Sequence, residues 1–171
     1  MRPFTFLIFV ALSVPALCMA APDQGVPDYI APAQQTVLKA WISEHPEFRV
    51  ANDKDCECSD DIAELRKGDG GVWKANPKFH PYYVSGDFNK DKQLDFAVIL
   101  IKQSEKGKHF LAIFNGPFKK HSKPAFLSAE DGALFYGAPR PKPYSLIVGV
   151  FGSEGGALKA KGASYEFAED E

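Results

Sequence analysis

Hydrophobic and polar positions divide the chain into three parts. Residues 4–14 are almost uniformly apolar, residues 32–44 carry apolar side chains at helical spacing, and from residue 79 onward short apolar runs alternate with polar turns. Helical spacing predicts an amphipathic helix, and short runs of β-branched and aromatic residues predict strands. The pattern therefore predicts helices first and strands afterwards, which is typical of an α+β domain with an antiparallel sheet.

Two short N-terminal helices are expected. The first begins at Pro32, which suits a first helical turn, and ends before His45-Pro46. Its apolar positions recur three and four residues apart: Val37, Leu38, Trp41 and Ile42. The second covers residues 60–67, with acidic residues at its start and Gly68 directly after its end.

The chain from residue 79 onward is rich in strand patterns. The expected strands span residues 82–84, 96–101, 110–114, 144–151, 157–161 and 164–167. The segment 96–101 is a nearly continuous apolar run, and it is expected to pair with 110–114 across a turn. Pro139, Pro141 and Pro143 make the stretch before residue 144 extended and unpaired.

The first twenty residues are typical of a signal peptide. Arg2 precedes the apolar run, and Cys18-Met19-Ala20 places small residues where cleavage after Ala20 is expected. The run is shorter than the roughly 20 apolar residues that a membrane span needs. Lipidation of Cys18 is the alternative. Such a signal predicts export to the periplasm or the medium. In the mature chain, residues 21–31 are expected to form a flexible lead-in and residues 32–171 one globular domain.

Charge and composition narrow the class of partner. Because Arg2 is the only charged residue in the signal segment, its removal changes the formal net charge from −2 to −3. This mild acidity argues against a nucleic-acid partner, which requires a basic face. Aromatic residues make up 13% of the chain, which favours a folded, sheet-rich domain. A protein partner is compatible with this surface, and no later segment is apolar enough to span a membrane.

Only two cysteines remain after cleavage, Cys56 and Cys58, with one residue between them. Three interpretations stay open. The two cysteines form a strained and easily reduced local disulfide, or they are free thiols, or they supply half of a zinc site completed by His45 or His80.

The segment between the first two strands carries oxygen side chains at alternate positions: Asp87, Asn89, Asp91, Gln93 and Asp95. Counted from the first, they occupy positions 1, 3, 5, 7 and 9. A hard cation such as Ca²⁺ takes six to eight oxygens, and a tight loop supplies them from alternate side chains and one backbone carbonyl at position 7. Val98 stands at position 12, where an EF-hand has a bidentate Glu, so an EF-hand is excluded.

Residues 86–98 resemble the calcium loop of FG-GAP or VCBS-type repeats, which links two antiparallel strands. The resemblance implies a structural Ca²⁺ held by the side chains and the Gln93 carbonyl named above. Lys90 and Lys92 stand where the family usually has glycines, and a single copy does not make a propeller. The alternative is a solvated turn in which Asp and Asn side chains cap their own backbone.

Catalytic motifs are lacking. His45, His80, His109 and His121 lie in no recognisable pattern, and there is neither a nucleophile elbow nor a phosphate-binding glycine loop. A pairing of Cys58 with His80 has no third group to orient it. We therefore predict no catalytic residues and a protein that is not an enzyme.

The C-terminal segment 159–165 interleaves lysines with small residues before an aromatic residue. It resembles the loop Ser-Gly-Ser-Gly-Ala-Lys-Tyr of one family of periplasmic lysozyme inhibitors, with Gly162, Ala163 and Tyr165 identical. Gly-Ala-Ser-Tyr-Glu-Phe also resembles a string in periplasmic immunity proteins that neutralise peptidoglycan hydrolases. The resemblance implies five partner-binding residues: Lys159, Lys161, Gly162, Ser164 and Tyr165. The alternative is that Tyr165 and Phe167 face the core.

Three functional hypotheses follow. The first is an exported, non-enzymatic binding protein that acts as an inhibitor or immunity protein against a lysozyme-like peptidoglycan hydrolase. The second is a calcium-dependent surface or carbohydrate-binding module, which depends on the acidic loop alone. The third is an unrecognised hydrolase.

Overall fold

The computed structural model describes residues 25–68, 75–105, 108–136, 146–151 and 155–168. The predicted signal peptide, the cysteine at its end and the proline-rich segment before residue 144 lie outside these residues. Among the described residues, no helix is long and apolar enough to cross a bilayer.

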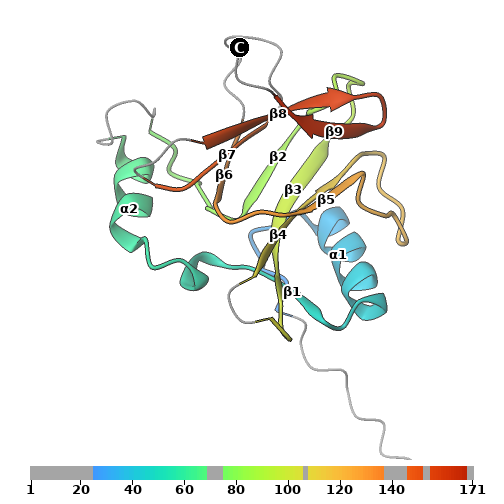
Figure 1. The fold of residues 1–171 in the computed structure, drawn as a ribbon, viewed down its shortest axis with the longest axis horizontal. Coiled ribbons are helices and arrows are strands. Elements are labelled where there is room, and N and C mark those ends of the chain that lie inside the picture. Colours follow the sequence, from blue (N-terminus) through green and yellow to red (C-terminus); the bar gives the residue numbers. More distant parts are fainter. Residues whose placement is uncertain (1–24, 69–74, 106–107, 137–145, 152–154, 169–171) are drawn as a thin grey trace, which may run out of the picture.

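The described strands form two antiparallel sheets, which confirms the predicted α+β class but divides the expected single sheet in two (Figure 1). The first sheet contains β1 (Phe48–Val50), β2 (Tyr83–Gly86), β3 (Asp95–Lys102), β4 (His109–Phe114) and β5 (Phe126–Ala129). Its order is β1-β3-β4-β5, and β2 pairs with β3 on the same side as β1. The second sheet has the order β6 (Ala133–Tyr136), β7 (Leu146–Gly149), β8 (Gly155–Lys161) and β9 (Ser164–Phe167).

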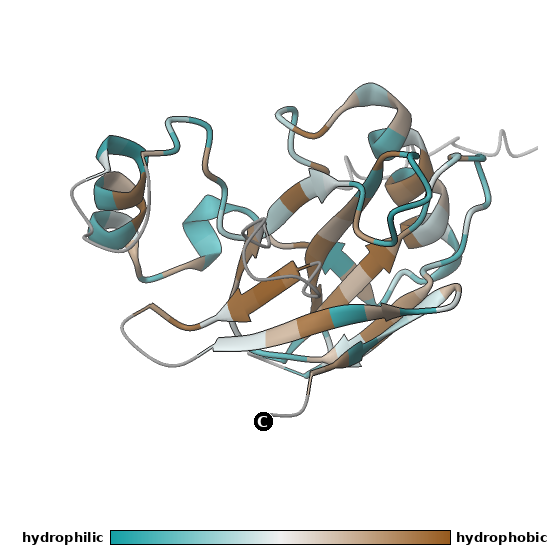
Figure 2. Cartoon of the chain, turned by 90° about the horizontal axis from the view of Figure 1, so that it is seen from above, coloured by the Kyte–Doolittle hydropathy of each residue, from teal (hydrophilic) through white to brown (hydrophobic). Residues whose placement is uncertain are grey.

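Strand β3 is the centre of the molecule because both of its faces are buried. Phe96, Val98 and Leu100 pack in the cluster that contains helix α1 (Pro32–Glu44). Ala97 and Ile99 face the opposite cluster, which the second sheet covers. Successive side chains of a strand point to opposite faces, so burial of both faces requires a continuous apolar run. Hydrophobic residues accordingly gather on the central strands, and hydrophilic ones on the turns (Figure 2).

Helix α1 covers the outer face of the first sheet. Its Trp41 ring packs against Phe48 at a centroid distance of 5.4 Å. The buried Gln34 accepts a hydrogen bond of 2.6 Å from the hydroxyl of Tyr83. These contacts fasten the apolar stripe of the helix to β1 and β2.

Helix α2 (Ser59–Lys67) ends at Gly68, which adopts a left-handed φ of 88°. A side chain there would lie 2.7 Å from the Cβ of Ala75, so glycine suits this position sterically as well. On its buried side, Ile62 and Leu65 pack in a third cluster that includes residues of β6.

The chain order departs from the expectation that all helices precede all strands. Strand β1 lies between α1 and α2, where Phe48 pairs with Lys102 at the end of β3. Strand β1 was not predicted, because its three residues are too few to show a periodicity. The residue that pairs with Phe48 in β3 is more than 50 positions away in the sequence.

Burial of β3 predicts a large effect of truncating its side chains. Leu100 has no exposed surface, so Leu100→Ala is expected to lower the free energy of unfolding by about 2–5 kcal/mol. The control Leu127→Ala, at a position 44% exposed on β5, is expected to change it by no more than about 0.5 kcal/mol. Urea unfolding followed by circular dichroism measures both. Equal losses in the two variants would contradict the central place of β3.

Candidate functional site

A buried carboxylate closes the acidic loop between β2 and β3. Asp95 has no exposed surface, and its Oδ2 accepts hydrogen bonds from the backbone N–H groups of Phe88, at 2.8 Å, and Asn89, at 3.3 Å. Its Oδ1 accepts one from the N–H of Gly116, at 3.0 Å, in the segment that follows β4. A carboxylate removed from water needs such donors. Asp95 thus joins both ends of the loop to a distant segment.

The loop is built from side-chain to backbone hydrogen bonds. Asn89 Oδ1 accepts from the N–H of Asp91, at 3.0 Å, and Asp91 Oδ1 accepts from the N–H of Gln93, at 2.7 Å. Asp87 Oδ2 accepts from the N–H of Lys92, at 3.0 Å. These are the self-capping bonds that the turn alternative predicts.

The two lysines at the family's glycine positions adopt the backbone conformation that glycine favours. Lys90 has a φ of 63° and Lys92 a φ of 69°. The left-handed region costs a non-glycine residue about 1–2 kcal/mol. Glycine would avoid this backbone cost at both positions.

The residues of the acidic loop fit a calcium ion only in part. Oδ1 of Asp87 is buried and accepts no hydrogen bond, an arrangement that costs free energy and that a cation would relieve. In the described residues, however, no three His, Cys, Asp or Glu side chains converge as a preformed metal site requires. Asp87, Asn89, Asp91, Gln93 and Asp95 as calcium ligands stay a prediction.

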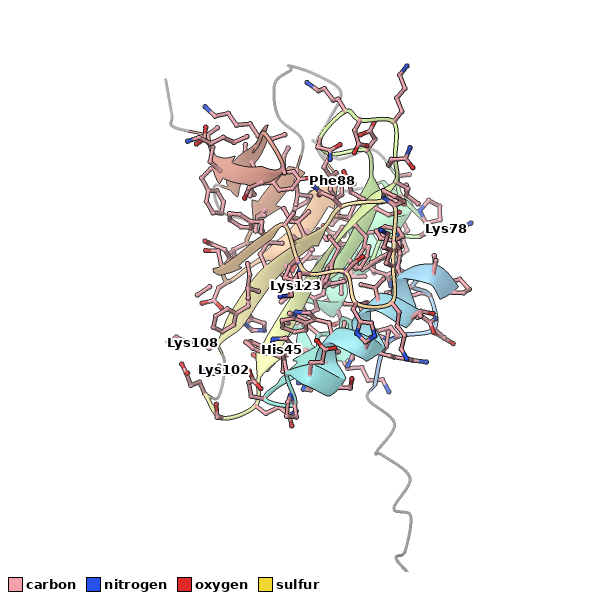
Figure 3. All side chains as sticks on the ribbon, turned by 90° about the vertical axis from the view of Figure 1, so that its right-hand side faces the viewer. His45, Lys78, Phe88, Lys102, Lys108 and Lys123 are labelled. Atoms are coloured by element: carbon pink, nitrogen blue, oxygen red, sulfur yellow. A yellow bond between two sulfur atoms is a disulfide. The ribbon has the colours of Figure 1, made fainter. Side chains whose placement is uncertain are left out.

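The side chain of Phe88 anchors the loop to the core. This side chain has no exposed surface and is directed from the loop into the molecule (Figure 3). It belongs to the cluster between the two sheets, together with Tyr165 of β9. The loop is therefore packed onto the second sheet as well as onto β3.

The second predicted site, at the C-terminal hairpin, adjoins the first. Tyr165 is only 4% exposed, and its hydroxyl lies 2.8 Å from Oδ1 of Asn115 and 3.4 Å from Oδ2 of Asp95. With one proton to donate, the phenol makes its hydrogen bond to the nearer Asn115. Burial raises the pKa of the Tyr165 phenol, and the negative charge of Asp95 raises it further. The ring thus occupies the core, as the alternative interpretation has it.

The turn between β8 and β9 is exposed but held in place. Gly162 has a φ of 61° and nothing within 4 Å of the position a side chain would take. Directly after Gly162, the amide of Asn115 donates to the carbonyl of Ala163, at 3.2 Å, and the hydroxyl of Ser164 donates to the carbonyl of Ala125, at 2.8 Å. The structure therefore presents small residues at the tip and holds the turn against the residue before β5 and the residue after β4.

The lysines of β8 lie over Glu166 of β9. Lys161 forms an ion pair with Glu166, and Lys159 lies 3.6 Å from the same carboxylate. The hydrogen bond from Lys161 lowers the pKa of Glu166 below its usual value. Among the five predicted partner-binding residues, only Tyr165 is withdrawn from the surface.

The structure unites two segments that the sequence separates by more than 60 residues. Asp95, Asn115 and Tyr165 lie together, so the loop and the hairpin turn form one continuous feature. Asn115 and Gly116 were not predicted, because their roles depend on tertiary contacts and no local motif marks them. A side chain on Gly116 would lie 2.6 Å from the Leu94 carbonyl, which explains glycine there.

The cysteine pair is bonded as a Cys56–Cys58 disulfide, the first of its three alternatives. Its proposed zinc partners have other roles: His45 bonds to the carbonyl of Trp41, and His80 contacts the carboxylate of Asp53 at 3.1 Å. With Cys58 in a disulfide, no Cys58 thiolate is available for the conceivable pairing with His80.

Comparison with family models, with curated proteins and with solved structures gave no match for this chain. The resemblances of segments 86–98 and 159–165 therefore stand on their local residues alone.

The geometry of Asp95 predicts a specific sensitivity to loss of charge. Asp95→Asn replaces an acceptor oxygen by an NH₂ group that faces a backbone N–H donor, so the free energy of unfolding is expected to fall by about 2–3 kcal/mol. Glu47→Gln, the same kind of change at an exposed carboxylate, should leave it within about 0.5 kcal/mol. Urea denaturation compares the variants. A stability of Asp95→Asn equal to wild type would refute the role of this carboxylate.

Proposed function

We propose that this chain is an exported, non-enzymatic binding protein of the periplasm or the medium. It acts as an inhibitor or immunity protein, using the turn between β8 and β9 to block the cleft of a lysozyme-like peptidoglycan hydrolase. The observation that carries the proposal is the combination of exposure and anchoring in this turn. The resemblance of segment 159–165 to lysozyme inhibitors suggests the class of partner.

A fixed turn binds better than a mobile one. Ordering a flexible loop on association costs free energy, and a loop held in its bound shape avoids that cost. Here Ser164, Asn115 and the buried Tyr165 hold the turn. Gly162 and Ala163 give its tip a narrow profile that suits a cleft. Tyr165 contributes as an anchor of the turn.

Charge supports an acidic partner. Glycoside hydrolases of the lysozyme type carry two carboxyl groups in the cleft. The Lys161 side chain is 71% exposed, and its pairing with Glu166 is a surface ion pair, which contributes little to stability. Its ammonium group can therefore exchange Glu166 for a carboxylate of the partner at small cost.

A calcium ion has a structural part in this proposal. Asp87, Asn89, Asp91 and the carbonyl of Gln93 would hold it, and the ion would stiffen the loop. Asp95 connects this loop to the segment after β4, where Asn115 holds the hairpin turn. The buried, unpartnered Oδ1 of Asp87 supports this assignment. The same oxygen favours a second candidate function, a calcium-dependent surface or carbohydrate-binding module, in which Leu94, 53% exposed on the loop, contacts the ligand.

Inhibition provides the first test. The full chain should inhibit a lysozyme-type hydrolase at stoichiometric amounts in a cell-wall lysis assay, and Ala163→Arg should weaken inhibition at least tenfold by adding bulk at the tip. Ser104→Arg is the matched control, because it adds the same side chain in the exposed turn after β3. Figure 3 places the neighbouring Lys102 and Lys108 at the end of the strands opposite Phe88.

Two outcomes oppose the inhibitor assignment. If the wild-type chain leaves each lysozyme type fully active, the hydrolase partner is wrong. If Ser104→Arg weakens inhibition as much as Ala163→Arg, the turn is not the contact surface.

Calcium binding is tested separately by thermal unfolding. Millimolar Ca²⁺ should raise the melting temperature relative to chelator, because an ion that binds only the native state stabilises it by mass action. Asp91→Ala should abolish the increase, and Glu47→Ala, at an exposed position outside the loop, should retain it. An identical melting temperature of the wild type in calcium and in chelator would refute the ion site. A calcium effect without any hydrolase inhibition would favour the binding module.

A further inference from the structure

The Cys56–Cys58 disulfide lines a pocket. These two cysteines are distant in sequence from the acidic loop. The pocket has a volume of about 460 Å³ and is formed by the segment before and within α2 together with the ends of β4, β6 and β7. Its lining includes Cys56, Cys58, Tyr82, His109, Val150 and Phe151. Such a pocket is large enough for one or two side chains of a peptide.

This disulfide contributes little to holding the fold together. It joins residues two apart in the sequence, so it connects no distant segments. The stabilisation from closing a loop grows with loop length and is smallest for a loop of this size. A structural staple is therefore a poor explanation for the bond.

The two cysteine residues are exposed to different extents. Cys56 is partly exposed, whereas Cys58 is only 8% exposed and is the N-cap residue of α2. An external thiolate reaches the Cys56 sulfur first and releases Cys58. The N–H groups at the start of a helix stabilise a thiolate in that position.

Charged groups around the pocket act on this thiolate in both directions. Glu57, Asp61 and Asp131 line the pocket and disfavour a second negative charge. His109, which contacts Asp131 at 3.0 Å, opposes them when protonated. Asp60, in the first turn of α2, adds to the carboxylates. The pocket therefore places both repelling and attracting groups around a Cys58 thiolate.

We propose that Cys56–Cys58 is a thiol–disulfide exchange site for reduced polypeptides that carry an apolar residue beside a cysteine. The apolar wall supplied by Phe151, Tyr82 and the 53% exposed Val150 receives that residue. The inference does not depend on the hydrolase or on calcium.

The exchange balances with a substrate dithiol as the reductant. A substrate thiolate attacks the Cys56 sulfur, forming a mixed disulfide, and the electron pair of the broken bond leaves with Cys58, which takes up a proton. The second substrate thiolate then attacks its own sulfur in the mixed disulfide and releases Cys56. Two electrons pass from the substrate to the cysteine pair. A low-molecular-weight disulfide restores the pair by the reverse exchange.

The first experiment equilibrates the full chain in buffers with a graded ratio of reduced to oxidised glutathione, followed by alkylation and mass measurement. The pair is expected to convert from disulfide to dithiol within this range, with an unchanged circular dichroism spectrum. A pair that stays oxidised at every ratio, or a chain that unfolds when the pair is reduced, overturns the proposal.

The second experiment uses the two single variants and a peptide with one cysteine activated as an aromatic disulfide. Cys58→Ser leaves the accessible Cys56 thiol and should form the mixed disulfide at least tenfold faster than Cys56→Ser. In the Cys58→Ser background, Val150→Asp should slow capture of a peptide with an apolar neighbour several-fold, while the rate with a small aromatic disulfide stays the same. Equal rates for the two cysteines, or no effect of Val150→Asp on the peptide, contradict the assignment.

Discussion

The structure depends on one buried carboxylate at the start of β3. Asp95 is fully removed from water, and such a group is stable only where donors surround it. The chain supplies N–H groups from Phe88 and Asn89 on one side and from Gly116 on the other. This requirement brings the acidic loop and the segment after β4 to one place, and Asn115 in that segment accepts the hydrogen bond of Tyr165 from the C-terminal hairpin.

The layered core gives this end of the molecule its rigidity. Strand β3 carries Asp95 at its first residue and is then buried on both faces, under α1 on one side and the second sheet on the other. The turn between β8 and β9 is therefore displayed from a well-packed base. The disulfide pocket lies beside α2, and its lining residue Tyr82 belongs to the same cluster as Tyr165.

Much of the fold was predictable where a pattern is long. The apolar run of β3 and the side-chain spacing of the 87–95 loop were both identified from the sequence. Strands β1, β5 and β6 were missed, because three or four residues show no reliable alternation. The partner of β1 is also distant in the sequence, whereas β5 and β6 pair with the neighbouring strands β4 and β7. The sequence left open whether Tyr165 faces the core, and its burial comes from the packing of the second sheet, which contains β9, against the first. Asn115 and Gly116 were missed because only tertiary contact gives them a role.

Amide hydrogen exchange tests the role of Asp95 most directly. The N–H groups of Phe88 and Gly116 lie outside the strands, yet Asp95 accepts hydrogen bonds from both. The account predicts that both exchange slowly in the wild type, with protection approaching that of the amides of β3, and that both become fast in Asp95→Asn. Exchange of Phe88 and Gly116 at the rate of exposed turn residues in the wild type would contradict it.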